Sequence, residues 1–242
     1  MTTMLPAPSF SLSTGKHPLP QQGMCLMECV AFIAGEPHSD APQCASPVVA
    51  ELARVINDSA FDEGRQMLLR RILQIATSRG TPEQEHARFG RLADFVVREH
   101  LVALFNDAGL PDFATQALLL APLCQPEGRA AAVPVLQALV RQFNATFAGH
   151  KLPLGGPVSV AAAGLGHALG ALSLSTKPGQ LPEAASRIVF AMSALSFEDR
   201  LAVLDTLLLM GEPAPDAEIH DRRLVTRFLA LSDAAALSQL AA

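Results

Sequence analysis

The sequence predicts an all-α protein, a compact multi-helix bundle of roughly eight to ten helices. Three observations predict this class. Apolar residues recur at steps of three and four, as at Leu136, Val140 and Phe143. Residues that start or end helices flank such stretches. β-branched residues are dispersed along the chain, and there are no alternating apolar and polar runs of the kind that indicate a sheet.

The first helix is expected over residues 24–34, an apolar run that Glu28 interrupts and that Gly35 ends. A turn with two prolines follows. The hydroxyl of Ser46 can then accept a hydrogen bond from a first-turn N–H, while Pro47 fills the first helical position, where no donor is needed. A second helix is therefore expected to begin there.

The same signals mark the later helices. Thr81 and Pro82 repeat the pairing of a capping hydroxyl with a proline. Pro134 is expected to open its helix rather than to interrupt it, because a proline inside a helix removes one hydrogen bond. The remaining helices are expected over 62–79, 82–107, 112–120, 134–148, 158–174, 182–195, 198–210 and 219–231.

The domain organisation is predicted from composition. Residues 1–22 are rich in Pro, Ser and Thr and are expected to form a flexible lead-in. The loop 149–157 has three glycines and two prolines, so it is the predicted boundary between a helical subdomain over 23–148 and a second one over 158–242. The alternative is one domain with a long internal connection.

Composition also narrows the function classes. The chain has 242 residues, half of them apolar, so it can bury a substantial core. Its net charge of −5 and its lack of Trp and Tyr argue against nucleic-acid binding. The N-terminus shows no secretory signal, so a cytoplasmic location is expected, with the cysteines reduced. The apolar stretch 158–176 is rich in Ala, Gly and Ser, which favours a buried helix over a membrane span.

The candidate catalytic residues are Glu28, His38, Asp40 and Cys44. Glu28 lies on an apolar helix, so its pKa should rise unless a cation or a donor compensates. The turn after that helix could bring His38 and Asp40 close to this carboxyl group, which suits general acid or base chemistry. Cys44 lies near the start of the second helix, where thiol pKa values fall.

A structural interpretation of the same segment is favoured. It assigns Glu28 to backbone N–H groups or to a cation such as Arg54, and the Ser-Asp pair to a local turn. The residues expected to build this structural corner are Gly35, Glu36, Ser39, Ser46, Pro47, Asn57 and Asp58. No cofactor is predicted. A zinc site is the less favoured alternative, with Cys25, Cys29, His38 and Cys44 as candidate ligands.

Residues 23–58 resemble a family of proteins from bacteriophages and bacteria, especially actinobacteria. The shared pattern is C-x-M-E-x-x-A-x-x-A-G-E, then S-D-x-P-x-C-x-x-P, then N-D. The matching residues are Cys25, Met27, Glu28, Ala31, Ala34, Gly35, Glu36, Ser39, Asp40, Pro42, Cys44, Pro47, Asn57 and Asp58. The family has no established activity, so the resemblance implies a shared motif rather than a mechanism.

Three functions remain open at this point. The first is a helical interaction or accessory protein with a protein partner, related to phages or mobile elements. The second is a small enzyme that acts on a nucleotide or another polar metabolite. The third is a structural metal-binding protein.

Overall fold

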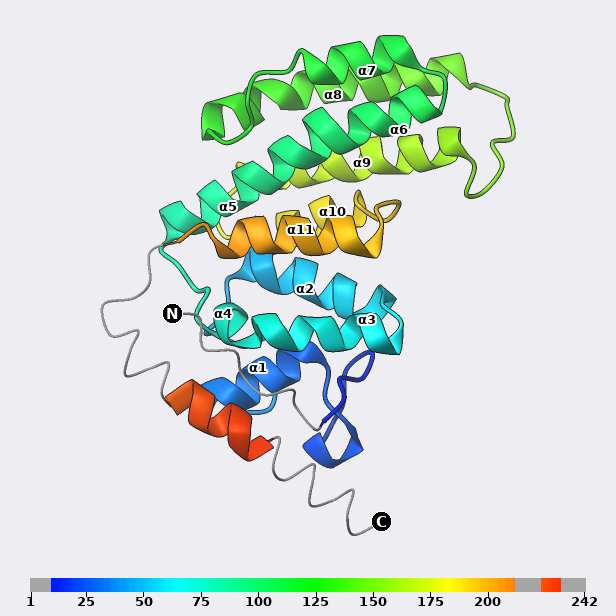
Figure 1. Cartoon of the computed structure of the whole chain (residues 1–242). Coiled ribbons are helices and arrows are strands. Elements are labelled where there is room, and N and C mark those ends of the chain that lie inside the picture. The colour runs from blue at the N-terminus through cyan, green and yellow to red at the C-terminus, as the bar shows by residue number, and fades with distance from the viewer. Residues whose placement is uncertain (1–9, 212–222, 232–242) are drawn as a thin grey trace. The chain divides into compact units, whose positions relative to one another are not determined.

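The computed structural model describes residues 10–211 and 223–231, and every regular element within these ranges is a helix (Figure 1). The predicted all-α multi-helix fold is thereby confirmed. Backbone contacts divide the chain into two units. The first unit comprises Met1–Gly80 and Leu204–Ala242, and the second comprises Thr81–Val203.

The first unit is built around a short apolar helix, α1 (Leu26–Ala34), which packs against two neighbours, α2 (Pro47–Ser59) and α4 (Ile72–Ala76). Between these neighbours lie α3 (Asp62–Gln66) and a 3₁₀ turn over Met67–Arg71, so the helix expected over 62–79 is divided. Completely buried apolar side chains from α1, α2, α4 and the 3₁₀ turn form the core, among them Leu26, Met27, Ile33, Leu52, Ile56, Leu68, Ile72 and Ile75.

Two predicted helix ends of this unit are confirmed, the start of α2 and the end of α1. Ser46 caps α2, since its side chain accepts a hydrogen bond of 3.3 Å from the N–H of Val49, and Pro47 is the first helical residue. Gly35 ends α1 with φ of 76°, in the left-handed region that glycine adopts without a Cβ penalty.

Residues 10–22 belong to the first unit instead of forming the flexible lead-in that their composition predicted. The side chain of Leu12 is only 3% exposed, and its N–H donates to Oε1 of Gln66 over 3.0 Å. The N–H of Ser13 donates to the carbonyl of Met24 over 2.9 Å. Long-range contacts of this kind leave no periodic pattern in the sequence. Residues 1–9 lie outside the described ranges.

A helix over 223–231 completes the described part of the first unit. Leu224 and Phe228, one turn apart, are each 1% exposed. The ring of Phe228 meets the ring of Phe10 edge to face, with 6.2 Å between centroids. The start of the helix expected over 219–231 lies outside the described residues.

The second unit begins with a long helical stretch, α5 (Pro82–Phe95), a π-helical turn over Val96–His100 and α6 (Leu101–Asp107). Thr81 caps it as predicted, with Gln84 completing a capping box. The other helices are α7 (Pro111–Leu118), α8 (Pro126–Thr146), α9 (Pro157–Ser175), α10 (Leu181–Phe190) and α11 (Phe197–Leu208). The last part of α11, from Leu204 onward, belongs to the first unit.

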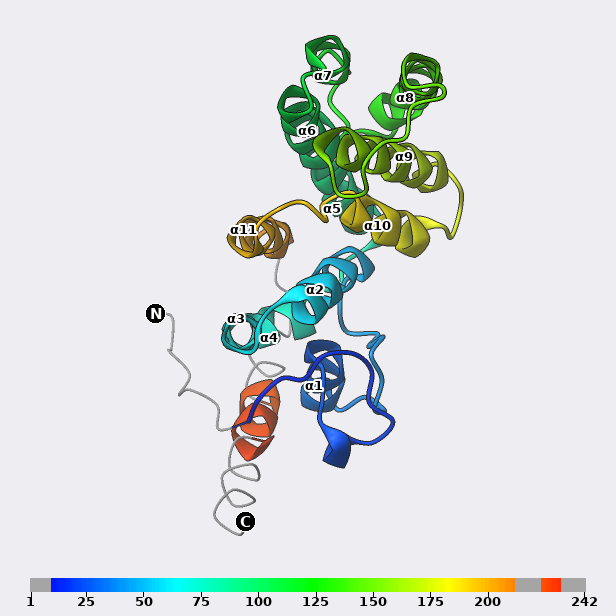
Figure 2. The same cartoon turned by 90° about the vertical axis from the view of Figure 1, so that its right-hand side faces the viewer.

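The α9 helix is central to the second unit, because α6, α8 and α10 all pack against it (Figure 2). Among the described helices it has the length and apolarity to cross a bilayer, with a mean hydropathy of 1.4, and 39% of that window is buried. The loop 149–157, the predicted domain boundary, joins α8 to α9 inside this unit.

The expected start of α8 at Pro134 is wrong. The helix begins at Pro126 and contains Pro134. Pro134 and Ala130, whose carbonyl loses its partner at that position, are both exposed, so water can bind the freed oxygen. Leu136 and Phe143 are buried as expected, but Leu139 takes the place expected for Val140 in the buried face. This face consists of Arg129, Ala132, Leu136, Leu139 and Phe143.

Candidate functional site

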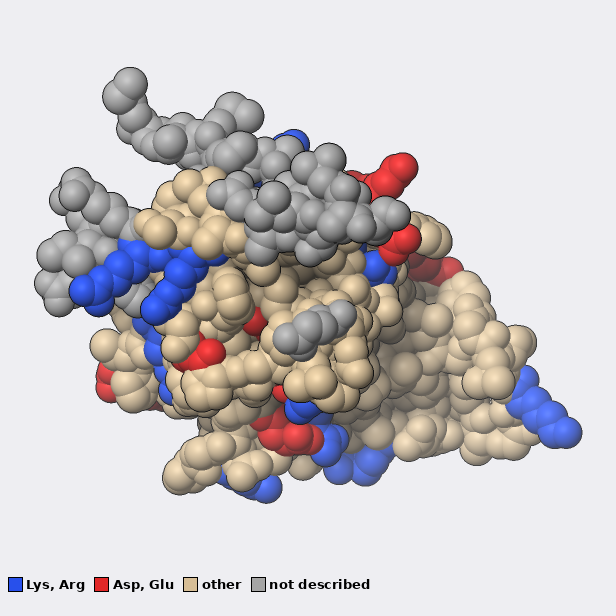
Figure 3. Space-filling view, turned by 90° about the horizontal axis from the view of Figure 1, so that it is seen from below, with Lys and Arg blue, Asp and Glu red and all other residues tan. Residues whose placement is uncertain are grey.

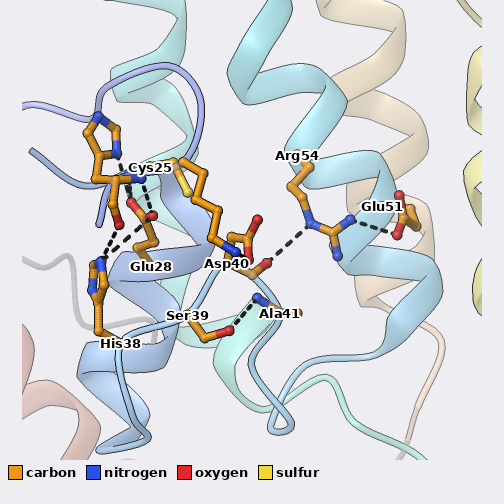
Figure 4. A network of polar contacts seen from close by, with 10 residues as sticks. Cys25, Glu28, His38, Ser39, Asp40, Ala41, Glu51 and Arg54 are labelled. Carbon is orange, nitrogen blue, oxygen red and sulfur yellow. Dashed lines mark hydrogen bonds and ion pairs between the residues drawn. The ribbon is translucent and has the colours of Figure 1, made fainter. Parts of the chain in front are cut away.

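The carboxylate of Glu28 lies in the interior of the first unit, at the N-terminal end of α1, where its residue is 0% exposed (Figure 4). Its Oε1 accepts a hydrogen bond of 2.6 Å from the N–H of His17. Its Oε2 accepts one of 2.8 Å from the N–H of Cys25, as in a capping box, and lies 2.9 Å from Nδ1 of His17. Glu28 therefore joins the start of α1 to the preceding segment.

A second histidine, His38, contacts both His17 and Glu28. Nε2 of His38 donates to the carbonyl of His17 over 2.8 Å and lies 3.7 Å from Oε1 of Glu28 (Figure 4). The side chains of His17 and His38 are 14% and 22% exposed. The backbone of His17 is thus held between Glu28 and His38. We call His17, Cys25, Glu28 and His38 the Glu28 cluster.

Hydrogen bonding keeps Glu28 charged despite its burial. Burial alone would raise the pKa of this carboxyl group, but the backbone N–H groups of His17 and Cys25 and the side chain of His17 together hold the pKa below its ordinary value. From the sequence, the pKa of Glu28 was expected to rise unless a cation or a donor compensated for burial, and such donors are present. At neutral pH the group is an ionised acceptor with both oxygens engaged, so it has no proton to donate as a general acid.

Asp40 serves a different part of the turn from Glu28. Its Oδ1 lies 3.1 Å from Nζ of Lys16, and its carbonyl accepts a hydrogen bond of 3.2 Å from Nε of Arg54. Arg54 also pairs with Glu51 across one helical turn, and Oγ of Ser39 accepts the N–H of Ala41 (Figure 4). These contacts fix the chain direction between α1 and α2, which is the local turn that the structural interpretation predicts.

Cys44 interacts with Glu36 rather than with the Glu28 cluster. The two carboxylate oxygens of Glu36 accept the N–H groups of Gln43 and Cys44 over 2.6 and 2.7 Å. Burial, followed by the negative charge of Glu36, raises the pKa of the Cys44 thiol to about 12. The thiol is therefore protonated at neutral pH, the opposite of what a cysteine nucleophile requires.

The candidate zinc ligands do not form a metal-binding group. Among the described residues no set of three His, Cys, Asp or Glu side chains is arranged to hold a metal ion. Burial raises the pKa of Cys25, the N-cap of α1, to about 11 and that of Cys29, inside α1, further, so both are protonated thiols. The Cys44 thiol faces Glu36.

Asn57 and Asp58, at the end of the motif, bind the N-terminal segment. Asn57 is 1% exposed, accepts the N–H of Leu26 over 3.3 Å and donates to the carbonyl of Ser13 over 3.0 Å. Oδ1 of Asp58 accepts the N–H of Gly15 over 3.0 Å. Asn57 and Asp58 therefore bind backbone groups of Ser13 and Gly15, in the segment expected to be a flexible lead-in.

The roles of His17 and Arg65 were not identified from the sequence. His17 lies in the Pro-rich stretch before the motif, where no periodicity or spacing indicates a partner for Glu28. Arg65, which the sequence analysis does not single out, is only 5% exposed. It donates to the carbonyls of Asn57 and Ala60 over 2.9 and 2.8 Å, at the C-terminal end of α2. A basic residue shortly after a helix end was the available signal.

Comparisons of the chain with protein-family models, with curated proteins and with solved structures gave no match. The fold and the Glu28 cluster define an all-α protein with a buried, ionised carboxylate at the N-terminal end of its first α-helix. The family resemblance of residues 23–58 stays a prediction.

Proposed function

We propose that the protein is a helical accessory protein that acts by binding another protein, and that residues 23–58 form a structural corner of its first unit. The observation that carries this proposal is the state of Glu28. Its carboxylate is 0% exposed and accepts hydrogen bonds from the backbone N–H groups of His17 and Cys25. A carboxylate so enclosed is not accessible to a substrate in solution and acts on the fold.

The remaining candidate catalytic groups support the same proposal. Asp40 pairs with Lys16, and the Cys44 thiol is protonated beside Glu36. A nucleophilic enzyme needs a thiolate or hydroxyl next to a base, and an acid–base enzyme needs a carboxyl group that reaches its substrate. Of the four proposed catalytic residues, Glu28 and His38 lie 3.7 Å apart in one cluster, whereas Asp40 and Cys44 have their partners in other parts of the turn.

Exposed apolar side chains offer surface for a protein partner. Phe61 in the first unit is 91% exposed, and Leu118 and Leu119 at the end of α7 in the second unit are 52% and 77% exposed. Large apolar side chains anchor protein interfaces when they are buried on binding. On the face drawn in Figure 3, basic and acidic side chains both occur within a larger uncharged area. Such a mixed surface suits a protein better than nucleic acid.

The resemblance of the motif suggests where this partner belongs. An accessory protein encoded by a phage or mobile element would meet its partner in the cytoplasm. A reducing compartment suits a chain whose described cysteines, Cys25, Cys29, Cys44 and Cys124, are all free thiols.

Photocrosslinking in the cells that make the protein tests this function. Benzoylphenylalanine placed at Phe61 or at Leu119 should give a discrete protein adduct, whereas the same probe at Asp112, exposed at the opposite end of α7, should not. The absence of adducts at both apolar positions, or equal adducts at Asp112, contradicts the proposal. So does a Glu28→Gln variant that keeps its melting temperature but loses its cellular phenotype.

A further inference from the structure

A pocket of about 670 Å³ lies within the second unit, where the first turns of α5 and α8 meet the last turn of α9. Figure 1 shows these three helix ends at the same end of the unit. The volume is in the range of small-molecule sites. Its polar lining includes Glu83, His86, Cys124, Glu127, Arg129 and Ser175.

Arg129 is a buried cation without a contacting counter-ion: Glu127 acts on it electrostatically without forming an ion pair, and its guanidinium carbon lies 5.8 Å from the ring centroid of Phe89. The residue is 1% exposed, and among the described residues no carboxylate oxygen lies within 4.0 Å of its guanidinium. Nη1 donates to the carbonyls of Leu123 and Cys124 over 3.0 and 3.1 Å, which fixes the orientation of the group. Nε is buried and has no hydrogen-bond partner. A buried charge is costly unless an opposite charge compensates it, so this arrangement calls for an anion.

The start of α8 adds a second attraction for an anion at the same place. This helix has 21 residues, and Gln125 at its N-cap makes no side-chain capping hydrogen bond. The positive end of the helix dipole and the first-turn N–H groups therefore lack a side-chain acceptor there. Nδ1 of His86, on the α5 side of the pocket, is also buried without a partner.

The rim limits the charge and the kind of ligand. Glu83 and Glu127 are exposed carboxylates that line the pocket, and both repel a ligand with several negative charges. Ala87, Pro126 and Ala130 provide apolar lining for an organic body. The pocket therefore favours one acidic group on an apolar molecule over a polyphosphate.

We propose that this pocket binds a small organic acid carrying a single carboxylate, which lies at the N-terminus of α8 above Arg129, with His86 as a further donor. The site is separate from the proposed protein-binding function, because none of the exposed apolar residues named for that function lines the pocket.

The test is titration of the full-length protein with phenylacetate, followed by ¹H–¹⁵N correlation NMR. Saturable shifts are expected at the N–H groups of Glu127 and Gly128, with a dissociation constant of about 1 mM, as for a fragment of this size. Phenylacetamide, the neutral isostere, should shift these signals at least about tenfold more weakly. Inorganic phosphate should bind more weakly than phenylacetate.

Two variants test the roles of the charges without touching the fold. His86→Ala removes a side chain for which the structure shows no hydrogen bond, and it should weaken phenylacetate binding about fivefold. Glu127→Gln removes a repelling charge at the exposed rim and should tighten binding about threefold. Arg129→Met should abolish binding, but it also leaves the carbonyls of Leu123 and Cys124 without their donor and can disturb the fold. The test of the charge argument therefore depends on the His86 and Glu127 variants.

Three results would overturn the proposal. The first is the absence of saturable shifts at the start of α8 up to about 10 mM phenylacetate, tenfold above the expected constant. The second is equal binding of phenylacetamide, which would leave only apolar contact. The third is weaker binding by Glu127→Gln or tighter binding of phosphate, since either contradicts the charge argument.

Discussion

The guanidinium of Arg227 fills the space that a Cβ on Gly35 would occupy, with Nη1 only 1.9 Å from that position. The same Nη1 donates to the carbonyl of Ile33 over 3.2 Å, at the C-terminal end of α1. A basic side chain from the helix over 223–231 thus binds a carbonyl that α1 leaves without a helical partner. The glycine that ends α1 is needed for this contact as well as for its own backbone conformation.

Gly35→Ala should therefore destabilise the protein more than Gly15→Ala. Both glycines have positive φ, 76° and 72°, but no atom lies within 4 Å of a Cβ on Gly15. The backbone cost is about 1 kcal/mol at each position. Gly35→Ala also displaces Arg227, which adds about 1 kcal/mol for the lost hydrogen bond. Denaturant unfolding of both variants measures the difference.

The Arg227→Ala background provides the control. Without the guanidinium, Gly35→Ala should cost the same as Gly15→Ala, because only the backbone strain remains. If Gly35→Ala still destabilised the protein more than Gly15→Ala in that background, Arg227 would not be the cause of the difference.

Acid should weaken the first unit through Glu28. Its pKa is lower in the folded protein than the ordinary value of 4.5. The resulting stability is therefore present above the unfolded pKa and is lost as the pH falls through the folded one. Melting temperatures between pH 7 and pH 3 should show this loss.

The Glu28→Gln variant should be less stable by about 2 kcal/mol at neutral pH, because an amide cannot accept from all of the donors around it. Its stability should also depend less on pH below about 4.5. Glu63→Gln is the matched control, since Glu63 is an exposed carboxylate on α3. If Glu28→Gln retained the full acid sensitivity of the parent, another carboxylate would be responsible.

His100 should give a separate effect at higher pH. It lies in the π-helical turn, is 7% exposed and has a buried Nε2 without a partner. Burial lowers its pKa below the ordinary value of 6.5. The unfolded chain then binds a proton more readily, so stability falls as the pH drops below about 6.5.

Melting temperatures at pH 7.5 and 5.5 measure this effect. His100→Leu should reduce the difference between the two values, whereas His150→Leu, at an exposed position in the second unit, should leave it unchanged. An unaltered difference in His100→Leu would assign the pH dependence to another group.

Local signals were sufficient to predict the fold class and many helix ends. Ser46 and Thr81 cap helices through their own side chains, and Gly35 adopts a backbone conformation that glycine favours. Such features depend on residues a few positions apart. They can therefore be predicted from the sequence without knowledge of the tertiary structure.

The partners of Glu28 could not be predicted in the same way. That Glu28 would be buried follows from its apolar neighbours, but His17 lies 11 residues earlier in a segment without helical periodicity. The start of α8 was missed for a related reason. Pro126 and Pro134 both carry the signal of a first helical residue, and only the burial of Arg129 and Ala132 shows that the helix has already begun.

Gly90 provides a final prediction, in the wall behind Arg129. A Cβ at this position of α5 would lie 2.7 Å from the carbonyl oxygen of Cys124 and 2.8 Å from Nη1 of Arg129. The first contact is with backbone, which cannot swing aside as a side-chain end can. Gly90→Ala should therefore destabilise the protein by about 2 kcal/mol, as overpacking does in other cores.

Gly166→Ala is the matched control, because Gly166 also lies inside a helix but has no atom within 4 Å of a Cβ. There the substitution should stabilise the protein by about 0.5–1 kcal/mol through helix propensity alone. Opposite signs in the two variants, measured by denaturant unfolding, would establish that α5 packs tightly at Gly90 against the backbone of Cys124 and the side chain of Arg129. Stabilisation by both substitutions would mean that this wall is loose, and the buried guanidinium would then lack the fixed position that the ligand pocket requires.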